Sequence, residues 1–129
     1  MKLIITGSLD FTDDTYLRHT IKKICSEYDL LEIVCGTENR GIHWVAKSLA
    51  VELGIHIKEF AVDENRYGRR AGFVRNELMI AYGTALLVIW DGKSPGTKHM
   101  INTALKQGLS ACIHNITPIT GNADGALPL

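Results

Sequence analysis

Residues 85–97, Ala-Leu-Leu-Val-Ile-Trp-Asp-Gly-Lys-Ser-Pro-Gly-Thr, carry the pattern that decides the fold of this 129-residue chain. The uninterrupted apolar run 86–90 is typical of a strand that is covered on both faces of a sheet. A loop with Asp91 and Gly92 follows, and Pro95 suits the first turn of a helix. The stretch therefore predicts a buried strand, a glycine-containing loop and a helix in direct succession.

The same succession repeats along the rest of the chain. The other predicted strands are the short apolar runs 3–5, 31–35, 55–60 and 111–113. Between the strands, apolar residues recur at helical spacing: Leu17, Ile21, Ile24 and Tyr28; Val45, Leu49 and Leu53; Val74, Leu78 and Tyr82; Ile101 and Leu105. Strands that alternate with helices indicate right-handed crossovers. The predicted fold class is α/β, a parallel sheet of about five strands with helices on both faces.

Three local signals refine this prediction. The run 55–60 alternates between apolar and polar residues, which suits a strand near a sheet edge. Thr12 is the expected cap of the first helix, and Gly54 is expected to end the second. We expect one domain over residues 1–116, followed by an irregular C-terminal tail over 117–129.

The composition excludes several classes of protein. With 46% hydrophobic residues, the chain can bury a core without disulfides or metal. Its 14 basic residues balance 14 acidic ones, so no global field attracts nucleic acid or an anionic membrane. Its three cysteines and five histidines lack the spacing of a disulfide framework or a metal site. We expect a cytoplasmic protein without a membrane span, metal or cofactor.

The candidate binding site lies in the loops after the first, second and fourth predicted strands. In an open parallel sheet, ligands bind beyond the carboxyl ends of the strands, near the point where the strand order reverses. Glycine lets backbone amides approach an anion, and a helix N-terminus behind it adds partial positive charge. The loop residues predicted to bind a phosphate-bearing ligand are Gly7, Ser8, Gly36, Thr37, Arg40, Gly41, Asp91, Gly92, Ser94, Gly96 and Thr97. The alternative is that these glycines only make tight turns from strand to helix, and that Asp91 only holds its own loop.

A local cluster of arginines at 66–75 adds further candidates to an otherwise neutral chain. An arginine fork suits phosphate or carboxylate, and tyrosine can stack on a base or ribose. Tyr67, Arg75 and Asn76 are the predicted ligand contacts here, whereas the other arginines suit a solvated helix start. Glu38 is the acid in the second loop that lies near the predicted site.

Several of these motifs together resemble the SLOG superfamily, in its small YspA-like branch of bacteria and phages. They are Thr6-Gly7-Ser8 with 10–13, the loop 36–41, Tyr67-Gly68 with Ala71-Gly72, Arg75-Asn76, and the run 90–99, in this order. The resemblance covers roughly residues 1–114. It implies a Rossmann-like domain that binds a nucleotide-derived ligand, often similar to ADP-ribose, and that self-associates as a homo-oligomer.

The chain also departs from the family pattern at three places. Leu9 stands where relatives often have an arginine, and the second loop ends in His43 instead of aspartate. Some relatives are phosphoribohydrolases with a glutamate three residues after the Gly-Thr of the last loop; Met100 occupies that position here. A thioether cannot transfer a proton, so hydrolysis by that route is not expected.

The leading hypothesis from the sequence is a protein that binds a nucleotide-derived small molecule as a sensor or by sequestration. Its concrete form is a phage protein that withholds an ADP-ribose-like immune signal from its receptor. The alternative is a nucleotide N-glycosidase or phosphoribohydrolase in which Glu38 replaces the missing acid. Nucleic-acid binding is a weaker third reading because the charge is balanced and the arginine cluster is short.

Overall fold

A computed structural model, which describes residues 1–116 and 123–124, contains one six-stranded sheet with the order β3-β2-β1-β4-β5-β6. The strands are β1 (Lys2–Gly7), β2 (Glu32–Gly36), β3 (His56–Phe60), β4 (Ala85–Trp90), β5 (Ser110–Ile116) and β6 (Ala123–Asp124). Strands β1 to β5 are parallel, and β6 pairs antiparallel to β5. The predicted α/β, Rossmann-like fold class is confirmed, and β3 lies at the sheet edge, as its alternating pattern predicts.

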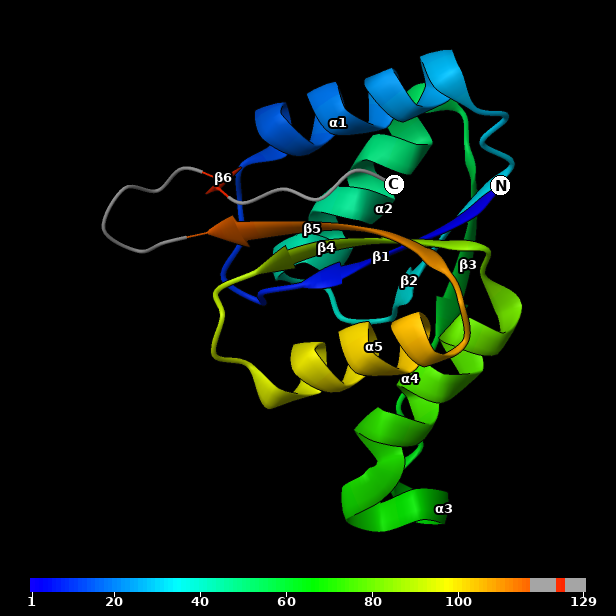
Figure 1. The fold of residues 1–129 in the computed structure, drawn as a ribbon, viewed down its shortest axis with the longest axis vertical. Helices are drawn as coiled ribbons and strands as arrows, with labels where there is room; N and C mark the ends of the chain where they lie inside the picture. Colours follow the sequence, from blue (N-terminus) through cyan, green and yellow to red (C-terminus); the bar gives the residue numbers. More distant parts are fainter. Residues whose placement is uncertain (117–122, 125–129) are drawn as a thin grey trace.

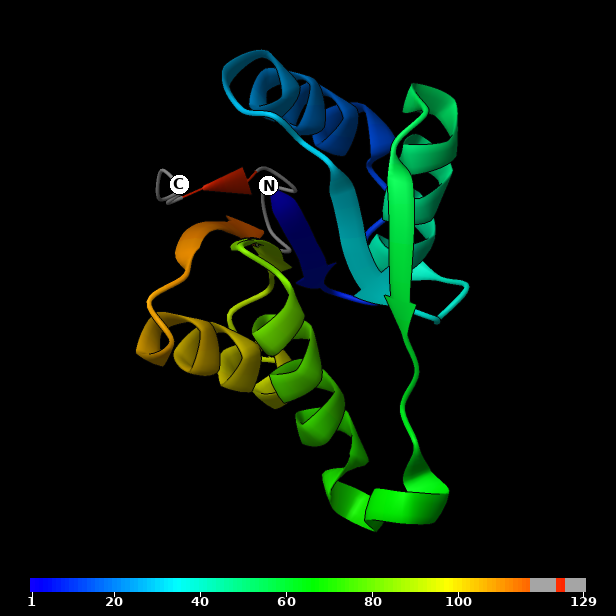
Figure 2. The same cartoon turned by 90° about the vertical axis from the view of Figure 1, so that its right-hand side faces the viewer.

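Helices cover both faces of this sheet (Figures 1 and 2). They are α1 (Asp14–Glu27), α2 (Gly41–Leu53), α3 (Glu64–Tyr67), the 3-10 turn η1 (Gly68–Arg70), α4 (Ala71–Tyr82) and α5 (Pro95–Lys106). α1 and α2 lie on one face and α4 and α5 on the other, whereas α3 lies away from the sheet at the outer end of α4 (Figure 2). The parallel strands are therefore shielded on both sides, which explains their continuous apolar runs.

The two faces of the sheet contribute to two separate cores. Leu3 and Ile5 of β1 join the core under α1 and α2, while Ile4 between them joins the core under α4 and α5. All three side chains are fully buried. This division follows from the alternation of side chains along a strand.

Two expectations about the helices need correction. Asp13, not Thr12, caps α1, because its carboxylate accepts a hydrogen bond from the Tyr16 amide. The prediction that Leu78 lies on the buried face of α4 is also wrong, since Leu78 is 50% exposed whereas Met79 and Ile80 are buried. The periodicity of Val74, Leu78 and Tyr82 is compatible with either face, and packing against α5 and the sheet selects the face with Met79.

The chain ends are described in part. The predicted irregular tail at 117–129 lies outside the described residues except for Ala123–Asp124, which form β6 beside β5.

Gly54, at φ 70°, ends α2 in the left-handed conformation that glycine favours, as predicted. Across the part of the chain that is described, no helix is both long and apolar enough to cross a bilayer.

The strand order locates the site. From β1 the chain passes to β2 and then β3 on one side, and β4 and β5 lie on the other side of β1. The order therefore reverses between β1 and β4, which pair directly from Leu3–Ala85 to Gly7–Ile89. In open α/β sheets the crevice beyond this reversal is where ligands bind.

Candidate functional site

A pocket of about 260 Å³ lies beyond the carboxyl ends of the central strands. Of the predicted site residues, six line it: Gly7, Arg75, Asn76, Ser94, Gly96 and Thr97. Six other residues complete the wall: Thr6, Leu9, Glu38, His43, Gly72 and Phe73. The pocket thus joins the ends of β1 and β2 with the first turns of α2, α4 and α5.

The start of α5 presents open hydrogen-bond donors to this pocket. Pro95 has no amide hydrogen, and the amides of Gly96 and Thr97 in the first turn have no acceptor among the described residues. Ser94 precedes the helix without a side-chain cap, and the first turn contains no acidic residue. In contrast, aspartates cap α1 and α3. The Asp91 carboxylate accepts from the Lys93 and Ser94 amides just before this helix, and the Gly96 and Thr97 amides are left open to a ligand.

Neighbouring side chains hold the α5 start in place. Asn76 is buried, and its Nδ2 donates to the Gly96 carbonyl oxygen at 3.2 Å. The Thr97 hydroxyl lies 3.3 Å from the Ser94 Oγ. The indole of Trp90 donates to the Ser94 carbonyl oxygen at 3.3 Å. These contacts pin the backbone and leave two hydroxyls beside the open amides.

The wall formed by the β2 loop is built differently, around Glu38. Arg75 Nη1 donates to Glu38 Oε1 at 2.6 Å, and His43 Nε2 lies 3.1 Å from Glu38 Oε2. The other ring nitrogen of His43, Nδ1, accepts a hydrogen bond from the Gly36 amide at 3.0 Å. The Nε2 of His43 therefore carries the proton and donates to Glu38. Arg75 Nε is buried without a partner among the described residues.

Burial and charge fix the protonation of this cluster. Burial lowers the pKa of His43 to about 4, so the ring is neutral at pH 7. Burial alone would raise the pKa of Glu38, but the hydrogen bond from Arg75 holds the pKa of that carboxyl below its ordinary value. The result is an ionised carboxylate between a guanidinium and a neutral imidazole.

The loop after β1 offers fewer donors than the sequence predicts. The Ser8 amide donates to the Ile89 carbonyl oxygen at 2.9 Å, and the Asp10 amide donates to the Ser8 hydroxyl at 3.2 Å. Gly7 has a φ of 146°, and a Cβ there would overlap the Ile89 carbonyl oxygen. This glycine is required by the close approach of β1 to β4.

The remaining predicted residues lie outside the pocket wall. Gly36 and Asp91 stabilise their own loops. The Gly36 amide donates a hydrogen bond to His43, and the Asp91 carboxylate accepts hydrogen bonds from the Lys93 and Ser94 amides. These amides hold the pKa of Asp91 below its ordinary value. The others are Ser8, Thr37, Arg40, Gly41, Tyr67 and Gly92; Arg40 is exposed near Asp10, and Tyr67 lies on α3 against Arg66. The Ser8 and Gly36 amides are thus bonded within the protein, which fits the alternative that the glycines of the β1 and β2 loops only make turns.

The contact of His43 with Glu38 is a feature that the sequence does not predict. Only 3% of the His43 side chain is exposed, and it lies in the first turn of α2. Glu38 and His43 are five residues apart across a loop and a helix start, and that spacing alone does not show that they meet. Met100 is fully buried in the core under α4 and α5 and cannot touch a ligand.

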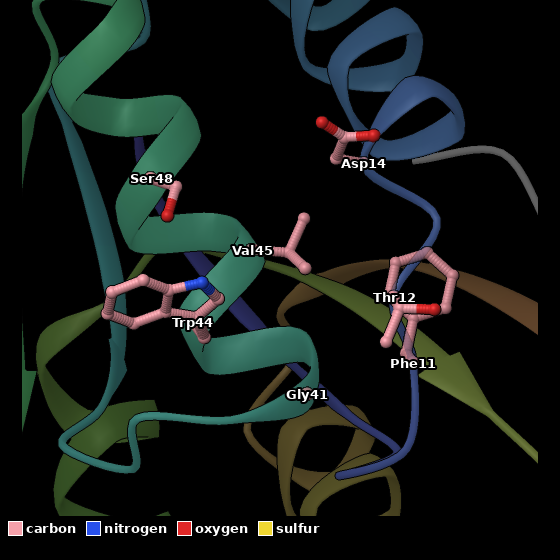
Figure 3. Close-up of a pocket in the computed structure, with 7 residues that line it drawn as sticks. All are labelled: Phe11, Thr12, Asp14, Gly41, Trp44, Val45 and Ser48. Carbon is pink, nitrogen blue, oxygen red and sulfur yellow. The ribbon is translucent and has the colours of Figure 1, made fainter.

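A larger hollow of about 420 Å³ lies between the segment before α1 and the outer side of α2 (Figure 3). Asp14, Ser48 and Trp44 are among its lining residues, and Asp14 is the charged member of that lining. Among the described residues, the lining of this hollow contains no cationic side chain, whereas Arg75 lines the smaller pocket at the strand ends. The smaller pocket, which also lies at the reversal of strand order, is therefore the better candidate for an anionic ligand.

The described part of the chain contains no group of three or more His, Cys, Asp or Glu side chains that could hold a metal ion. No model of a known protein family matches this chain, and no curated protein is similar to it at a significant level.

Proposed function

We propose that this protein binds a nucleotide-derived small molecule, similar to ADP-ribose, through a phosphate at the start of α5. The observation that carries the proposal is the uncapped first turn of α5, since Gly96 and Thr97 line the pocket at the strand-order reversal and their amides have no acceptor among the described residues. A phosphate there would gain amide donors, two hydroxyls and the partial charge of the helix.

The size and lining of the pocket support a phosphorylated sugar or a mononucleotide as the part that is enclosed. Its volume of about 260 Å³ lies just below the roughly 300–1,000 Å³ common for small-molecule sites. A larger ligand would extend past the rim, where Phe73 is 40% exposed. The ring of Phe73 lies 4.3 Å from that of His99, so its position is braced for stacking with a base.

Binding without turnover is the form of the function that the site favours. The pocket has open amides that can donate hydrogen bonds to an anion, whereas the Glu38 carboxylate already accepts hydrogen bonds from Arg75 and His43. Retention of a ligand fits a sensor or a sequestering protein. A cytoplasmic phage protein of the SLOG superfamily that captures an immune signal, acting as a homo-oligomer, is the concrete form of this proposal.

Calorimetric titration of the full chain with ADP-ribose and with AMP tests the proposal. We expect both to bind, and we expect Thr97→Val to weaken binding about tenfold because a hydroxyl beside the phosphate is lost. Thr103→Val, on the same helix but outside this pocket, is the matched control and should bind like the wild type. Absence of binding by both ligands to the folded wild type would refute the proposal.

A second candidate function rests on Glu38. It is the one carboxylate among the described residues that line the pocket, and the lowered pKa of its carboxyl keeps it ionised, which suits a stabiliser of developing positive charge. A nucleotide N-glycosidase or phosphoribohydrolase could use it in place of the buried Met100. Chromatography after incubation with AMP or ADP-ribose separates the two functions, since free adenine or ribose phosphate appears only if the protein is a hydrolase.

A further inference from the structure

The carboxylate of Glu38 has hydrogen-bond capacity that the protein does not fill. An ionised carboxylate has about four acceptor positions on its two oxygens. Arg75 Nη1 contacts Oε1 at 2.6 Å and Oε2 at 3.4 Å, and His43 Nε2 contacts Oε2 at 3.1 Å. The backbone amide of Glu38 itself also interacts with this carboxylate. What is left for a ligand is the exposed 26% of the side chain, which lines the pocket.

The pocket is polarised as a consequence. Its α5 wall carries the open amides of Gly96 and Thr97, which attract an anion. Its β2 wall carries Glu38, which repels an anion and accepts hydrogen bonds from neutral donors. A ligand that fills the pocket must therefore present a phosphate to one wall and a hydroxyl or amine to the other.

We infer that Glu38 binds the ribose hydroxyls of the ligand and so selects a ribonucleotide whose 2′ and 3′ positions carry free hydroxyl groups. The inference rests on the proposed function, since it assumes that a phosphate occupies the α5 wall. Adjacent hydroxyls are neutral donors that a carboxylate accepts well. Other α/β nucleotide sites place an acidic residue near the end of the second strand for the same contact, and Glu38 follows β2 by two residues.

Two neighbours of Glu38 make this selection sharp. Arg75 and His43 hold both carboxylate oxygens, so the acceptor is already oriented before a ligand arrives. A ligand that lacks the hydroxyls displaces water from the exposed part of this carboxylate without replacing its hydrogen bonds, which costs affinity. A phosphate in place of a hydroxyl would bring two negative charges together, so 2′-phosphorylated ligands are excluded.

The test compares AMP with 2′,3′-dideoxyadenosine monophosphate on the unaltered protein by calorimetric titration. Both nucleotides carry the phosphate and the base, and they differ only in the two hydroxyls. We expect the dideoxy compound to bind at least about tenfold more weakly, because a hydrogen bond to a charged acceptor contributes that much. Equal affinity would overturn the inference and leave the phosphate site standing, whereas failure of both to bind would overturn the proposed function together with the inference.

A variant ties the discrimination to Glu38 itself. Glu38→Gln keeps the shape of the side chain but removes its charge, and we expect the ratio between the two nucleotides to fall severalfold. Glu27→Gln, exposed at the far end of α1, is the matched control and should keep the wild-type ratio. An unchanged ratio in a folded Glu38→Gln variant would overturn the assignment; should that variant not fold, the comparison of the two nucleotides on the unaltered protein decides.

Discussion

The two sides of the pocket look alike in the sequence and differ in the structure. The closed side consists of the loops after β1 and β2. There the Ser8 amide donates a hydrogen bond to the Ile89 carbonyl oxygen, and the Gly36 amide donates one to His43 Nδ1. The open side is the turn from Ser94 to Thr97, where the Gly96 and Thr97 amides have no acceptor among the described residues. Both sides contain glycine, and both precede a helix.

The glycines on the two sides have different surroundings and therefore different roles. On the closed side, a Cβ at Gly7 would overlap the backbone of Ile89, and one at Gly36 would meet Arg75 and Glu38. On the open side, a Cβ at Gly96 would meet no atom within 4 Å. Backbone packing therefore requires glycine at position 7, and a residue larger than glycine at position 36 would displace the Arg75–Glu38 pair, while Gly96 leaves space for a ligand.

The largest expected loss of stability comes from a substitution on the closed side, at Gly7. Gly7→Ala must push β1 away from β4 and must also place a side chain at a positive φ, so we expect a loss of at least about 3 kcal/mol in the free energy of unfolding. Urea denaturation measures it. Gly72→Ala, in α4 with open space around it, is the control and should be neutral or gain up to about 1 kcal/mol. A Gly7→Ala protein as stable as the wild type would contradict the close approach.

The next effect concerns the ion pair on the closed side. Arg75→Met leaves the half-buried Glu38 carboxylate without its strongest partner, and we expect a loss of about 1 to 3 kcal/mol at pH 7. Arg18→Met, which removes a more exposed pair with Glu52, should cost less than Arg75→Met. If the double variant Arg75→Met with Glu38→Gln loses the full sum of the two single losses, the pair contributes nothing.

A smaller effect appears as a pH dependence. Burial lowers the pKa of His43 from 6.5 to about 4, so between these pH values the unfolded chain binds a proton that the folded protein does not. Stability is therefore lost as the pH falls from about 6.5 to about 4, by on the order of 2 kcal/mol from this group. Thermal melting across this range should show a flatter profile for His43→Gln, while His56→Gln, on the exposed edge strand, should keep the wild-type profile. Identical slopes for His43→Gln and the wild type would contradict a buried neutral ring.

The smallest expected change in stability lies on the open side. Gly96→Ala should alter the free energy of unfolding by less than about 0.5 kcal/mol, because the new methyl group meets no protein atom. It should weaken AMP binding severalfold, since the methyl occupies the approach of a phosphate to the amides. A variant with lower stability and unchanged affinity would reverse the assignment of the two sides.

The sequence predicts the strands, the sheet edge and the general place of the site. Continuous apolar runs such as 86–90 require cover on both faces, and parallel strands bring their loops to one edge. It does not predict which loops are open, because a hydrogen bond such as that from Gly36 to His43 depends on tertiary geometry. Arg75 was correctly placed at the pocket, but its pairing with Glu38 joins residues 37 positions apart, which no local pattern reveals.

The most direct test of the account is an amide NMR titration of the isotopically labelled protein with AMP. We expect the amide resonances of Gly96 and Thr97 to shift most, while those of Ser8 and Gly36, whose amides already donate to Ile89 and His43, shift little. Saturating shifts centred on Ser8 and Gly36, with Gly96 and Thr97 unmoved, would contradict it.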